Sequence, residues 1–401
     1  MKSRSEEFEE WGTEVIFGRA KGFRAAMMRM VLRGASWLFR LVVLARLYLF
    51  HSSIARQARL GMLVVSVGNI TVGGTGKTPV VELLARTLTR RERKVAILTR
   101  GYKSAELDKP QEWRDKDGRL PENLPKIASD GKTRYLSPLY SGDEPFMLAK
   151  NLDGVAVLVD KNRIKSGIFA IEHLGCDTLL LDDGMQYLKL AHELDIVLVD
   201  CGAPFGTGAM LPRGTLREPR SSLARASYII LTKCGGKPQD ELISSIRKYN
   251  PVADIIVSDH GPRYLENVFT GERLPLEALQ GKWVACLSGI ARPESFENSL
   301  RSLGAHVEIC RRFPDHHWFE QTELQEFYDR CADRAMDMIV TTEKDAVRLE
   351  KPEEAPEVPI YFLRIEVEIY QGREAWERCV DRICGISKPR PRDEWQPSSS
   401  F

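Results

Sequence analysis

The chain has 401 residues, more than one typical domain holds, and this length indicates two or three domains. Hydrophobic residues make up 43% and charged residues 28% of it, which is ordinary for a globular protein and excludes bulk disorder and a polytopic membrane protein. With 58 Lys plus Arg against 56 Asp plus Glu, the net charge of +2 does not indicate nucleic acid as a partner. The 8 cysteines form no C-x-x-C pair, so we expect buried thiols in a reducing compartment, with neither a zinc site nor a disulfide framework.

The N-terminal segment, residues 1–60, is basic and apolar. Glutamates are concentrated in residues 1–14, whereas residues 15–60 contain no acidic residue and alternate Lys or Arg with large apolar residues. On a helix, Arg29, Arg33 and Arg40 would lie within about 40° of one another, and the uncharged stretches are shorter than the ~20 residues that cross a bilayer. The pattern predicts an amphipathic helix on an anionic membrane surface. The alternative is a helix packed on the rest of the protein.

From residue 63 onward, short buried strands alternate with helices, which predicts parallel sheets covered by helices on both faces. In the first part we expect strands at 63–67, 94–99, 155–159, 178–181, 196–199 and 228–232, and helices at 77–90 and 164–174. In the second part we expect strands at 283–287, 307–309, 338–341 and 360–365, and helices at 294–303 and 322–335. We place a domain over residues 61–235 and a smaller α/β domain over 236–387. Residues 104–134 are expected to form a surface insertion, and 388–401 a disordered tail.

A glycine-rich turn, Gly73-Gly74-Thr75-Gly76-Lys77-Thr78, joins the first predicted strand to the first predicted helix. Glycines let backbone N–H groups approach phosphate oxygens, and the helix N-terminus adds its positive dipole end. Lys77 can reach the β- and γ-phosphates, and the Thr78 hydroxyl can bind Mg²⁺. One departure from G-x-x-x-x-G-K-[ST] is that threonine replaces the first glycine, at position 71. We interpret the turn as a nucleotide site of the P-loop type.

The identity of the nucleotide depends on residues 232–235. Thr232-Lys233-Cys234-Gly235 begins like the guanine-recognition sequence Asn/Thr-Lys-x-Asp, but glycine occupies the acidic position. ATP is therefore the expected nucleotide.

Acidic residues at two places are candidates for the chemistry. Asp182 and Asp183 end a buried strand, the position from which an acid holds Mg²⁺ beside the phosphate turn. Asp143 and Glu144 begin a predicted helix, where Asp143 is either an N-cap or a base that accepts the proton of an attacking hydroxyl.

Histidines and arginines complete the candidate set. His316 or His317 can pair with a carboxylate or cap the following helix. Arginines near strand ends or in loops can stabilise the charge of a γ-phosphate. These basic candidates are Arg100, Arg163, Arg213 and Arg217.

Together these residues resemble a known family, the tetraacyldisaccharide 4'-kinases, which are membrane-associated lipid A 4'-kinases of Gram-negative bacteria. The matching stretches cover about residues 60–350 in the family's order. They are Ser66-Val67-Gly68-Asn69, 73–79, Thr99-Arg100-Gly101-Tyr102, Gly142-Asp143-Glu144-Pro145, Asp160-Lys161-Asn162-Arg163, Asp182-Asp183-Gly184-Met185-Gln186, 211–218, Phe313-Pro314-Asp315-His316 and Thr342-Glu343-Lys344-Asp345-Ala346. The insertion at 104–134, the extended N-terminus and the C-terminal tail depart from the family pattern.

The resemblance implies transfer of the ATP γ-phosphoryl group to the 4'-hydroxyl of an acylated glucosamine disaccharide 1-phosphate, in lipid A (lipopolysaccharide) biosynthesis. It implies a P-loop kinase domain and a second α/β domain with the active site in the cleft. It also implies a place on the cytoplasmic face of the inner membrane, with neither nucleic acid nor an obligate protein partner.

The resemblance also assigns residues. Asp143 is a candidate base, Asp183 is implied to pair with His316, and Arg163 and Arg217 are implied to line the substrate or phosphate site. Arg100, Glu144 and Glu218 are further candidates for substrate binding, and Thr78 and Asp182 for Mg²⁺. The base is then either Asp143 or the Asp183–His316 pair.

Two other functions fit parts of the sequence. A soluble P-loop ATPase or ligase of the dethiobiotin synthetase type would be active without lipid. A membrane-associated nucleotide switch would hydrolyse ATP slowly and form no phosphorylated product.

Overall fold

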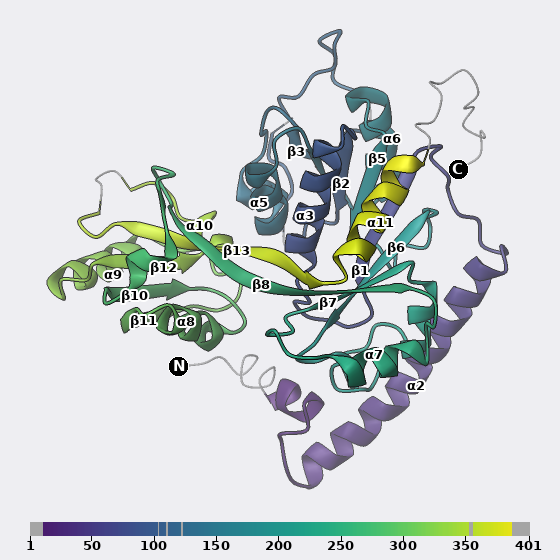
Figure 1. The fold of residues 1–401 in the computed structure, drawn as a ribbon, viewed down its shortest axis with the longest axis horizontal. Helices are drawn as coiled ribbons and strands as arrows, with labels where there is room; N and C mark the ends of the chain where they lie inside the picture. Colours follow the sequence, from purple (N-terminus) through teal and green to yellow (C-terminus); the bar gives the residue numbers. More distant parts are fainter. Residues whose placement is uncertain (1–10, 103, 110, 122, 353–355, 387–401) are drawn as a thin grey trace. The chain divides into compact units, whose positions relative to one another are not determined.

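The computed structural model describes residues 11–102, 104–109, 111–121, 123–352 and 356–386 (Figure 1). The chain divides into two compact units: unit 1 comprises 1–100, 162–259 and 369–401, and unit 2 comprises 101–161 and 260–368. These units interleave along the sequence, unlike the contiguous domains expected over 61–235 and 236–387. The tail expected at 388–401 and the glutamates within residues 1–10 lie outside the described residues.

Unit 1 contains a parallel sheet. Its strands are β1 (Leu63–Asn69), β2 (Val95–Thr99), β5 (Thr178–Asp182), β6 (Leu194–Asp200), β7 (Tyr228–Thr232) and the first part of β8 (Asp254–Asn267). The order is β8-β7-β6-β1-β5-β2, and each neighbouring pair runs parallel. Every residue of β1, β2, β5 and β7 is buried. Continuous burial is expected where helices cover both faces of a parallel sheet. The parallel pairing and the burial of these strands therefore confirm the predicted parallel sheet.

Helices cover this sheet. They are α3 (Lys77–Arg90), α6 (Arg163–Leu174), α7 (Asp240–Arg247) and α11 (Arg373–Gly385), with a 3-10 turn at Arg220–Arg225. Helix α3 packs against β1, β2 and β5, α6 against β2, and α11 against α3. The Asn162 side chain caps α6 by accepting from the backbone N–H groups of Ile164 and Lys165.

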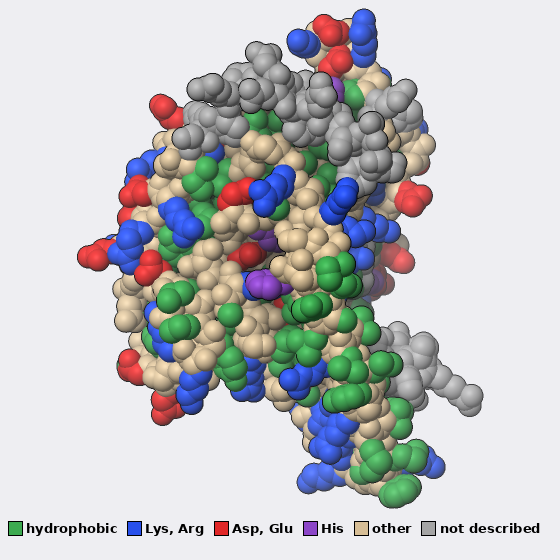
Figure 2. Space-filling model, turned by 90° about the vertical axis from the view of Figure 1, so that its right-hand side faces the viewer, with side chains coloured by type: hydrophobic (Ala, Val, Ile, Leu, Met, Phe, Trp, Pro, Cys, Tyr) green, Lys and Arg blue, Asp and Glu red, His purple; other side chains and the backbone are tan. Residues whose placement is uncertain are grey.

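A long helix, α2 (Phe23–His51), precedes the sheet. Phe39 and Val43 pack against the core of unit 1, and the Ser36 hydroxyl donates to the backbone oxygen of Leu211 at 3.1 Å. Its exposed large apolar residues are Phe23, Met27, Met30, Val31, Trp37, Leu38, Leu41, Val42, Leu44, Tyr48 and Leu49. Arg33 and Arg40 are exposed on the same helix. Figure 2 shows basic and hydrophobic side chains next to one another at its lower right. Solvent-facing positions thus carry apolar and basic side chains together, so the predicted division into an apolar and a polar face is not observed.

Among the described helices, none has the length and apolar character needed to cross a membrane.

Unit 2 is a second α/β unit. It contains the strand order β11-β10-β12-β13-β8, and β3 pairs with β4 in antiparallel orientation. The strands are β3 (Lys126–Asp130), β4 (Ala156–Val159), β9 (Arg273–Leu274), β10 (Trp283–Ser288), β11 (His306–Arg312), β12 (Met338–Thr342) and β13 (Ile360–Gln371). The helices are α4 (Pro138–Ser141), α5 (Asp143–Asn151), α8 (Pro293–Ser302), α9 (Gln321–Asp333) and α10 (Glu343–Ala346), with a 3-10 turn at Leu276–Leu279. Strands β8 and β13 run through both units.

The expected surface insertion at 104–134 is part of the packed structure of unit 2. Residues 126–130 form β3, and Trp113 is buried. The buried Gln111 side chain donates to the Pro125 oxygen at 2.7 Å and accepts from the Ile127 N–H at 2.6 Å. These bonds satisfy backbone groups that burial removes from water. The charge and proline content of the segment gave no sign of this packing.

The expectation that no cysteines pair was wrong. Cys201 and Cys234 form a disulfide whose Cα atoms are 5.0 Å apart. Cys201 directly follows β6 and Cys234 lies two residues after β7, and in the sheet Asp200 is opposite Thr232. Neighbouring strands bring together two residues that are 33 positions apart, so a search for short cysteine spacings does not find them.

Candidate active site

The predicted phosphate turn lies between β1 and α3 in unit 1. Gly73 and Gly76 have φ angles of 114° and 81°, a region that favours glycine. The Asn69 amide donates to the Thr75 hydroxyl at 3.0 Å, and the Thr232 hydroxyl donates to the Thr75 backbone oxygen at 2.8 Å. Side chains from β1 and β7 therefore hold the turn in place.

Asp183 binds two cations beside this turn. Strand β5 pairs with β1 so that Asp182 lies opposite Val67, and this register brings the end of β5 to the start of the turn. The Lys77 ammonium is 3.5 Å from Asp183 Oδ1, and Arg217 Nη1 donates to Asp183 Oδ1 and Oδ2 at 2.9 and 2.7 Å. Burial alone would raise the pKa of Asp183, but the charges of Lys77 and Arg217 outweigh it and hold that pKa below its ordinary value.

The two residues expected to bind Mg²⁺ are both in unit 1. The Asp182 carboxylate is buried and accepts from the Thr99 hydroxyl at 3.4 Å, and Thr78 is buried in the first turn of α3. One hydroxyl and one carboxylate form an oxygen donor set that suits Mg²⁺, which takes its other ligands from water and phosphate. Among the described residues there is no cluster of three or more His, Cys, Asp or Glu that could hold a metal alone. The residues present therefore fit Mg²⁺ bound together with a nucleotide.

The predicted substrate-binding residues of unit 1 differ in exposure. Arg163 is buried, its guanidinium lies 4.9 Å from the centre of the Tyr187 ring, and burial lowers its pKa. Arg100 follows β2 and is exposed. Glu218 is buried, pairs with Arg225 at 2.7 Å and accepts from the Gln186 amide at 3.1 Å. Glu218 is thus engaged within the protein, a geometry that fits support of the Arg217 loop better than contact with substrate.

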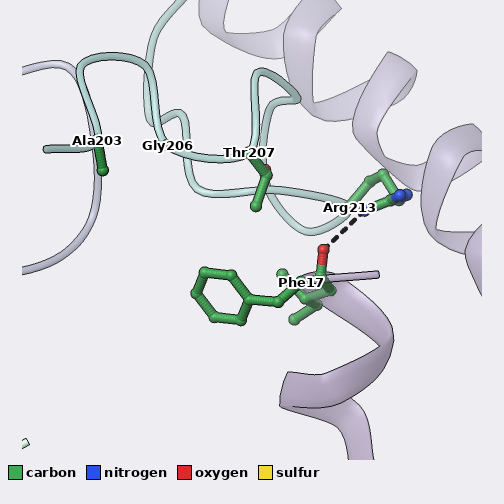
Figure 3. Close-up of a pocket in the computed structure, with 6 residues that line it drawn as sticks. Phe17, Ala203, Gly206, Thr207 and Arg213 are labelled. Atoms are coloured by element: carbon green, nitrogen blue, oxygen red, sulfur yellow. Dashed lines mark hydrogen bonds between the residues drawn. The ribbon is translucent and has the colours of Figure 1, made fainter. Parts of the chain in front are cut away.

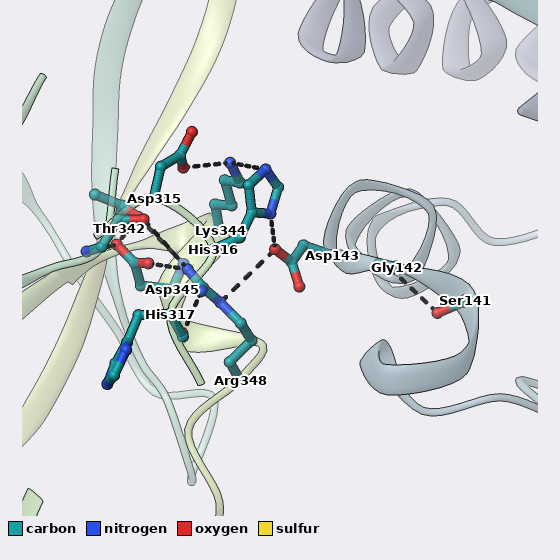
Figure 4. A network of polar contacts seen from close by, with 11 residues as sticks. Ser141, Gly142, Asp143, Asp315, His316, His317, Thr342, Lys344, Asp345 and Arg348 are labelled. Carbon is teal, nitrogen blue, oxygen red and sulfur yellow. Dashed lines mark hydrogen bonds and ion pairs between the residues drawn. The ribbon is translucent and has the colours of Figure 1, made fainter. Parts of the chain in front are cut away.

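In unit 2, the structure brings Asp143 and His316 together (Figure 4). His316 Nδ1 lies 2.8 Å from Asp143 Oδ2, and the Asp143 carboxylate is 7% exposed. Asp143 stands in the first turn of α5, and Glu144, beside it, is exposed. His316 adopts a φ of 67°, an unusual conformation for a residue other than glycine, and its N–H donates to the Gly289 oxygen at 3.3 Å. Unusual backbone conformations of this kind are concentrated at functional sites.

Two cations that sequence reasoning left without a role extend this pair. Lys344 Nζ lies 3.2 Å from His316 Nε2 and 3.0 Å from Asp315 Oδ1. Arg348, fully buried, has its Nε 3.7 Å from Asp143 Oδ2 and is paired with the buried Asp345. Burial raises the pKa of Asp345, against the opposing effects of Thr342, Gly289 and Arg348. The sequence signal for Lys344 and Asp345 was the stretch 342–346, and Arg348 lies outside it.

The predicted histidine partners can now be assigned in part. His317 Nε2 lies 2.9 Å from Glu323 in the first turn of α9, so this histidine supports the start of a helix. The implied pair of Asp183 with His316 joins residues of different units and stays a prediction. Within each unit, Asp183 is held by Lys77 and Arg217, and His316 by Asp143 and Lys344.

A separate hollow of about 380 Å³ lies in unit 1 beside the start of the described chain (Figure 3). Its lining residues are Ile16, Phe17, Ala203, Gly206, Thr207 and Arg213. The Arg213 guanidinium donates to the Ile16 oxygen at 2.9 Å and so ties the N-terminal segment to the loop after β6. Arg213, a basic candidate from the sequence, therefore has a structural contact.

Comparisons with known proteins show the family of this chain. The family model described as Tetraacyldisaccharide-1-P 4'-kinase (LpxK) matches residues 28–384. The chain is 38% identical over 387 residues to the tetraacyldisaccharide 4'-kinase of Anaeromyxobacter sp. (strain K), covering 95% of this chain and 98% of that one. It is 36% identical over 354 residues to the Geobacter sulfurreducens protein of the same name, covering 87% and 92%. The crystal structure of LpxK from Aquifex aeolicus in complex with ATP aligns with a TM-score of 0.67 and 27% identity, covering 89% of this chain and 99% of that one.

Proposed function

The chain belongs to the tetraacyldisaccharide-1-P 4'-kinase family, and from that premise we propose how its own residues transfer the ATP γ-phosphoryl group to the 4'-hydroxyl of tetraacyldisaccharide 1-phosphate. It is an ATP-dependent kinase of lipid A biosynthesis, as the resemblance implied. A P-loop ATPase, a nucleotide switch or a dethiobiotin-synthetase-like ligase is not favoured.

In this proposal unit 1 binds the nucleotide. The backbone N–H groups of Gly73–Lys77 and the Lys77 ammonium hold the phosphates. Arg217 and Arg163 stabilise the charge that spreads over the transferred phosphoryl group. Mg²⁺, bound by Thr78 and Asp182 together with the nucleotide, would neutralise charge on the phosphate oxygens.

Unit 2 supplies the base. Asp143 accepts the proton of the 4'-hydroxyl while the oxygen of that hydroxyl bonds to the γ-phosphorus, the bond from phosphorus to the β,γ-bridging oxygen breaks, and ADP leaves. The observation that carries this assignment is the 2.8 Å contact between Asp143 and His316. A histidine that donates to a carboxylate orients it and leaves its other oxygen for the substrate.

The test is phosphoryl transfer from [γ-³²P]ATP to a tetraacylated glucosamine disaccharide 1-phosphate by the full-length protein in detergent. We expect Asp143→Asn to lower kcat by roughly 10²–10⁴-fold, the usual range for loss of a general base, with little change in KM for ATP. The matched control is His192→Gln, because His192 also pairs with an aspartate, Asp195, at 3.1 Å. If Asp143→Asn keeps more than a third of the wild-type kcat, Asp143 is not the base.

We also propose that α2 places the enzyme on the anionic membrane surface at the cytoplasmic face of the inner membrane. Support comes from exposed apolar side chains beside arginines along one helix, a combination that suits the interface between head groups and acyl chains. Residues 1–50 cannot simply be removed, because Phe39 and Val43 pack on the unit 1 core.

The test therefore replaces only exposed residues of α2. A variant with Trp37, Leu38 and Leu41 changed to Gln should lose most of its binding to anionic vesicles while the purified protein keeps its melting temperature. Val252→Gln, which changes an 86% exposed apolar residue elsewhere in unit 1, is the control. Equal vesicle binding by the wild type and the triple variant would contradict the membrane role.

A further inference from the structure

Both ring nitrogens of His316 are engaged, and the two partners are chemically different (Figure 4). Nδ1 lies 2.8 Å from Asp143 Oδ2 and Nε2 lies 3.2 Å from Lys344 Nζ. The side chains of Asp143, His316 and Lys344 are 7%, 17% and 22% exposed, so little water competes for these contacts. The three residues come from α5, from the loop after β11 and from α10.

The partners fix where the proton of His316 lies. Lys344 Nζ forms an ion pair with Asp315 Oδ1 at 3.0 Å. An ammonium group has donors only, so Nε2 must be the acceptor. A neutral imidazole has one donor and one acceptor, so the proton is on Nδ1, which donates to Asp143.

We propose that Lys344 is a positioning residue for the transfer reaction: it holds His316 in the neutral, Nδ1-protonated tautomer that orients Asp143. This inference rests on the proposed role of Asp143 as the base. It gives a function to a lysine whose side chain contacts His316 and Asp315.

The consequence concerns the two oxygens of Asp143. Both contacts that the structure gives this carboxylate, from His316 and from Arg348 Nε at 3.7 Å, involve Oδ2. Oδ1 therefore takes the substrate proton. A second proton on His316 would make an imidazolium that withdraws charge from the carboxylate and weakens it as a base.

The ammonium of Lys344 opposes that second proton. The groups that face His316 are Asp143 from α5, Lys344 from α10, the preceding Asp315 and the Tyr102 ring, whose centre lies 5.6 Å from that of the imidazole. Two of these groups carry negative charge, and Lys344 is the cation placed at Nε2. Removing its charge leaves the acids unopposed at that nitrogen.

The direct test is the tautomer of His316 in the full-length, ¹⁵N-histidine-labelled protein in detergent, read from two-bond ¹⁵N–¹H couplings at pH 7. The signal is assigned by its loss in His316→Gln. We expect the Nδ1-protonated form in the wild type and in Lys344→Arg, and imidazolium or the Nε2-protonated form in Lys344→Met. Lys282→Met is the control, since Lys282 also pairs with an aspartate, Asp337, at 2.9 Å in unit 2. A different tautomer in the wild type, or an unchanged one in Lys344→Met, would overturn the proposal.

Kinetics then test whether the tautomer matters. In Lys344→Met we expect kcat to fall roughly tenfold at pH 7, which is less than the loss expected when the general base itself is removed. KM for ATP should be unchanged, and the loss of kcat should be larger at lower pH. Lys344→Arg should restore most of kcat. A changed tautomer with wild-type kcat would show that Lys344 does not position the base. An active Asp143→Asn would refute the proposed base, whereas a normal Lys344→Met beside an inactive Asp143→Asn would refute only the role of Lys344.

Discussion

Arg217 donates from a single guanidinium nitrogen to both carboxylate oxygens of Asp183, at 2.9 and 2.7 Å. Asp183 also lies 3.5 Å from the ammonium of Lys77, the residue that opens α3 at the phosphate turn. One carboxylate at the end of β5 thus contacts two cations, one from the start of α3 and one from the loop before β7. We infer that Asp183 arranges positive charge for the phosphates of ATP.

Asp183→Asn should therefore separate this arrangement from the fold. Asparagine keeps the size of the side chain but removes the charge that holds Lys77 and Arg217, so we expect kcat to fall by about 10²-fold, the scale of losing one preorganised electrostatic contact. Phosphoryl transfer to the lipid acceptor measures this. Asp254→Asn is the control, because Asp254 pairs with the exposed Arg378 at 3.0 Å. A kcat within threefold of the wild type would contradict the inferred role.

The lowered pKa of Asp183 also predicts how stability depends on pH. A carboxyl group whose folded-state pKa lies below its unfolded value stabilises the protein fully above the unfolded value, which is about 3.9. That contribution is lost as the pH falls through the folded-state pKa. Urea midpoints measured between pH 3 and 7 should converge for the wild type and Asp183→Asn as the pH falls. A difference that stayed constant with pH would contradict the shift.

Gly68 gives a prediction about packing in β1. A Cβ at this position would lie 2.6 Å from Met185 Cβ and 2.8 Å from the Met185 nitrogen, so a methyl group there must displace the segment after β5. Gly68→Ala should lower the free energy of unfolding by about 1–3 kcal/mol, as overpacking does. Gly261→Ala, where no atom lies within 4 Å of the added carbon, is the control for the change in residue type. Equal urea midpoints would show that β1 and Met185 are less tightly packed.

Cysteine reactivity should differ sharply between residues. Cys310 is exposed, and a hydrogen bond from Cys286 holds the pKa of its thiol below the ordinary value of about 8.5. Burial raises the pKa of Cys331 and of Cys379 to about 12. Because the thiolate is the reactive form, iodoacetamide at pH 7.5 should label Cys310 first and leave the other two unmodified until the protein unfolds. Peptide mass spectrometry, with Cys310→Ser as the control, measures the order, and early labelling of Cys331 would contradict it.

The local elements were predictable because their signals are local. Continuous apolar runs predicted β1, β2, β5 and β7, and the glycine-rich turn before Lys77 predicted the helix that begins there. The strands β3, β8 and β9 were not predicted. Strand β3 lies in a segment rich in charge, proline and glycine, and its burial depends on Gln111, 16 residues before Ile127. Strand β8 alternates buried, partly buried and exposed residues, which gives no continuous apolar run.

Partner choice in the site was the least predictable part. Asp143 and His316 were both candidates, but the residues alone left open which carboxylate the histidine meets. The contact between them spans 173 positions and depends on how segments 101–161 and 260–368 fold into one unit. The disulfide of Cys201 with Cys234 escaped prediction for a similar reason, since it depends on β6 and β7 being neighbours.

The sequence by itself determined the chemistry: a phosphate turn with its lysine and hydroxyl, carboxylates at a strand end, a set of arginines, and the family to which the chain belongs. These follow from residue types at short spacings, where backbone geometry leaves few alternatives. The tertiary structure decided which side chains meet: Asp183 with Arg217, Asp143 with His316, and Lys344 with the far nitrogen of that histidine. A contact between distant residues is set by the packing of whole strands and helices. That packing determines which surfaces are buried and which hydrogen bonds can form in the interior, and no single local preference does so.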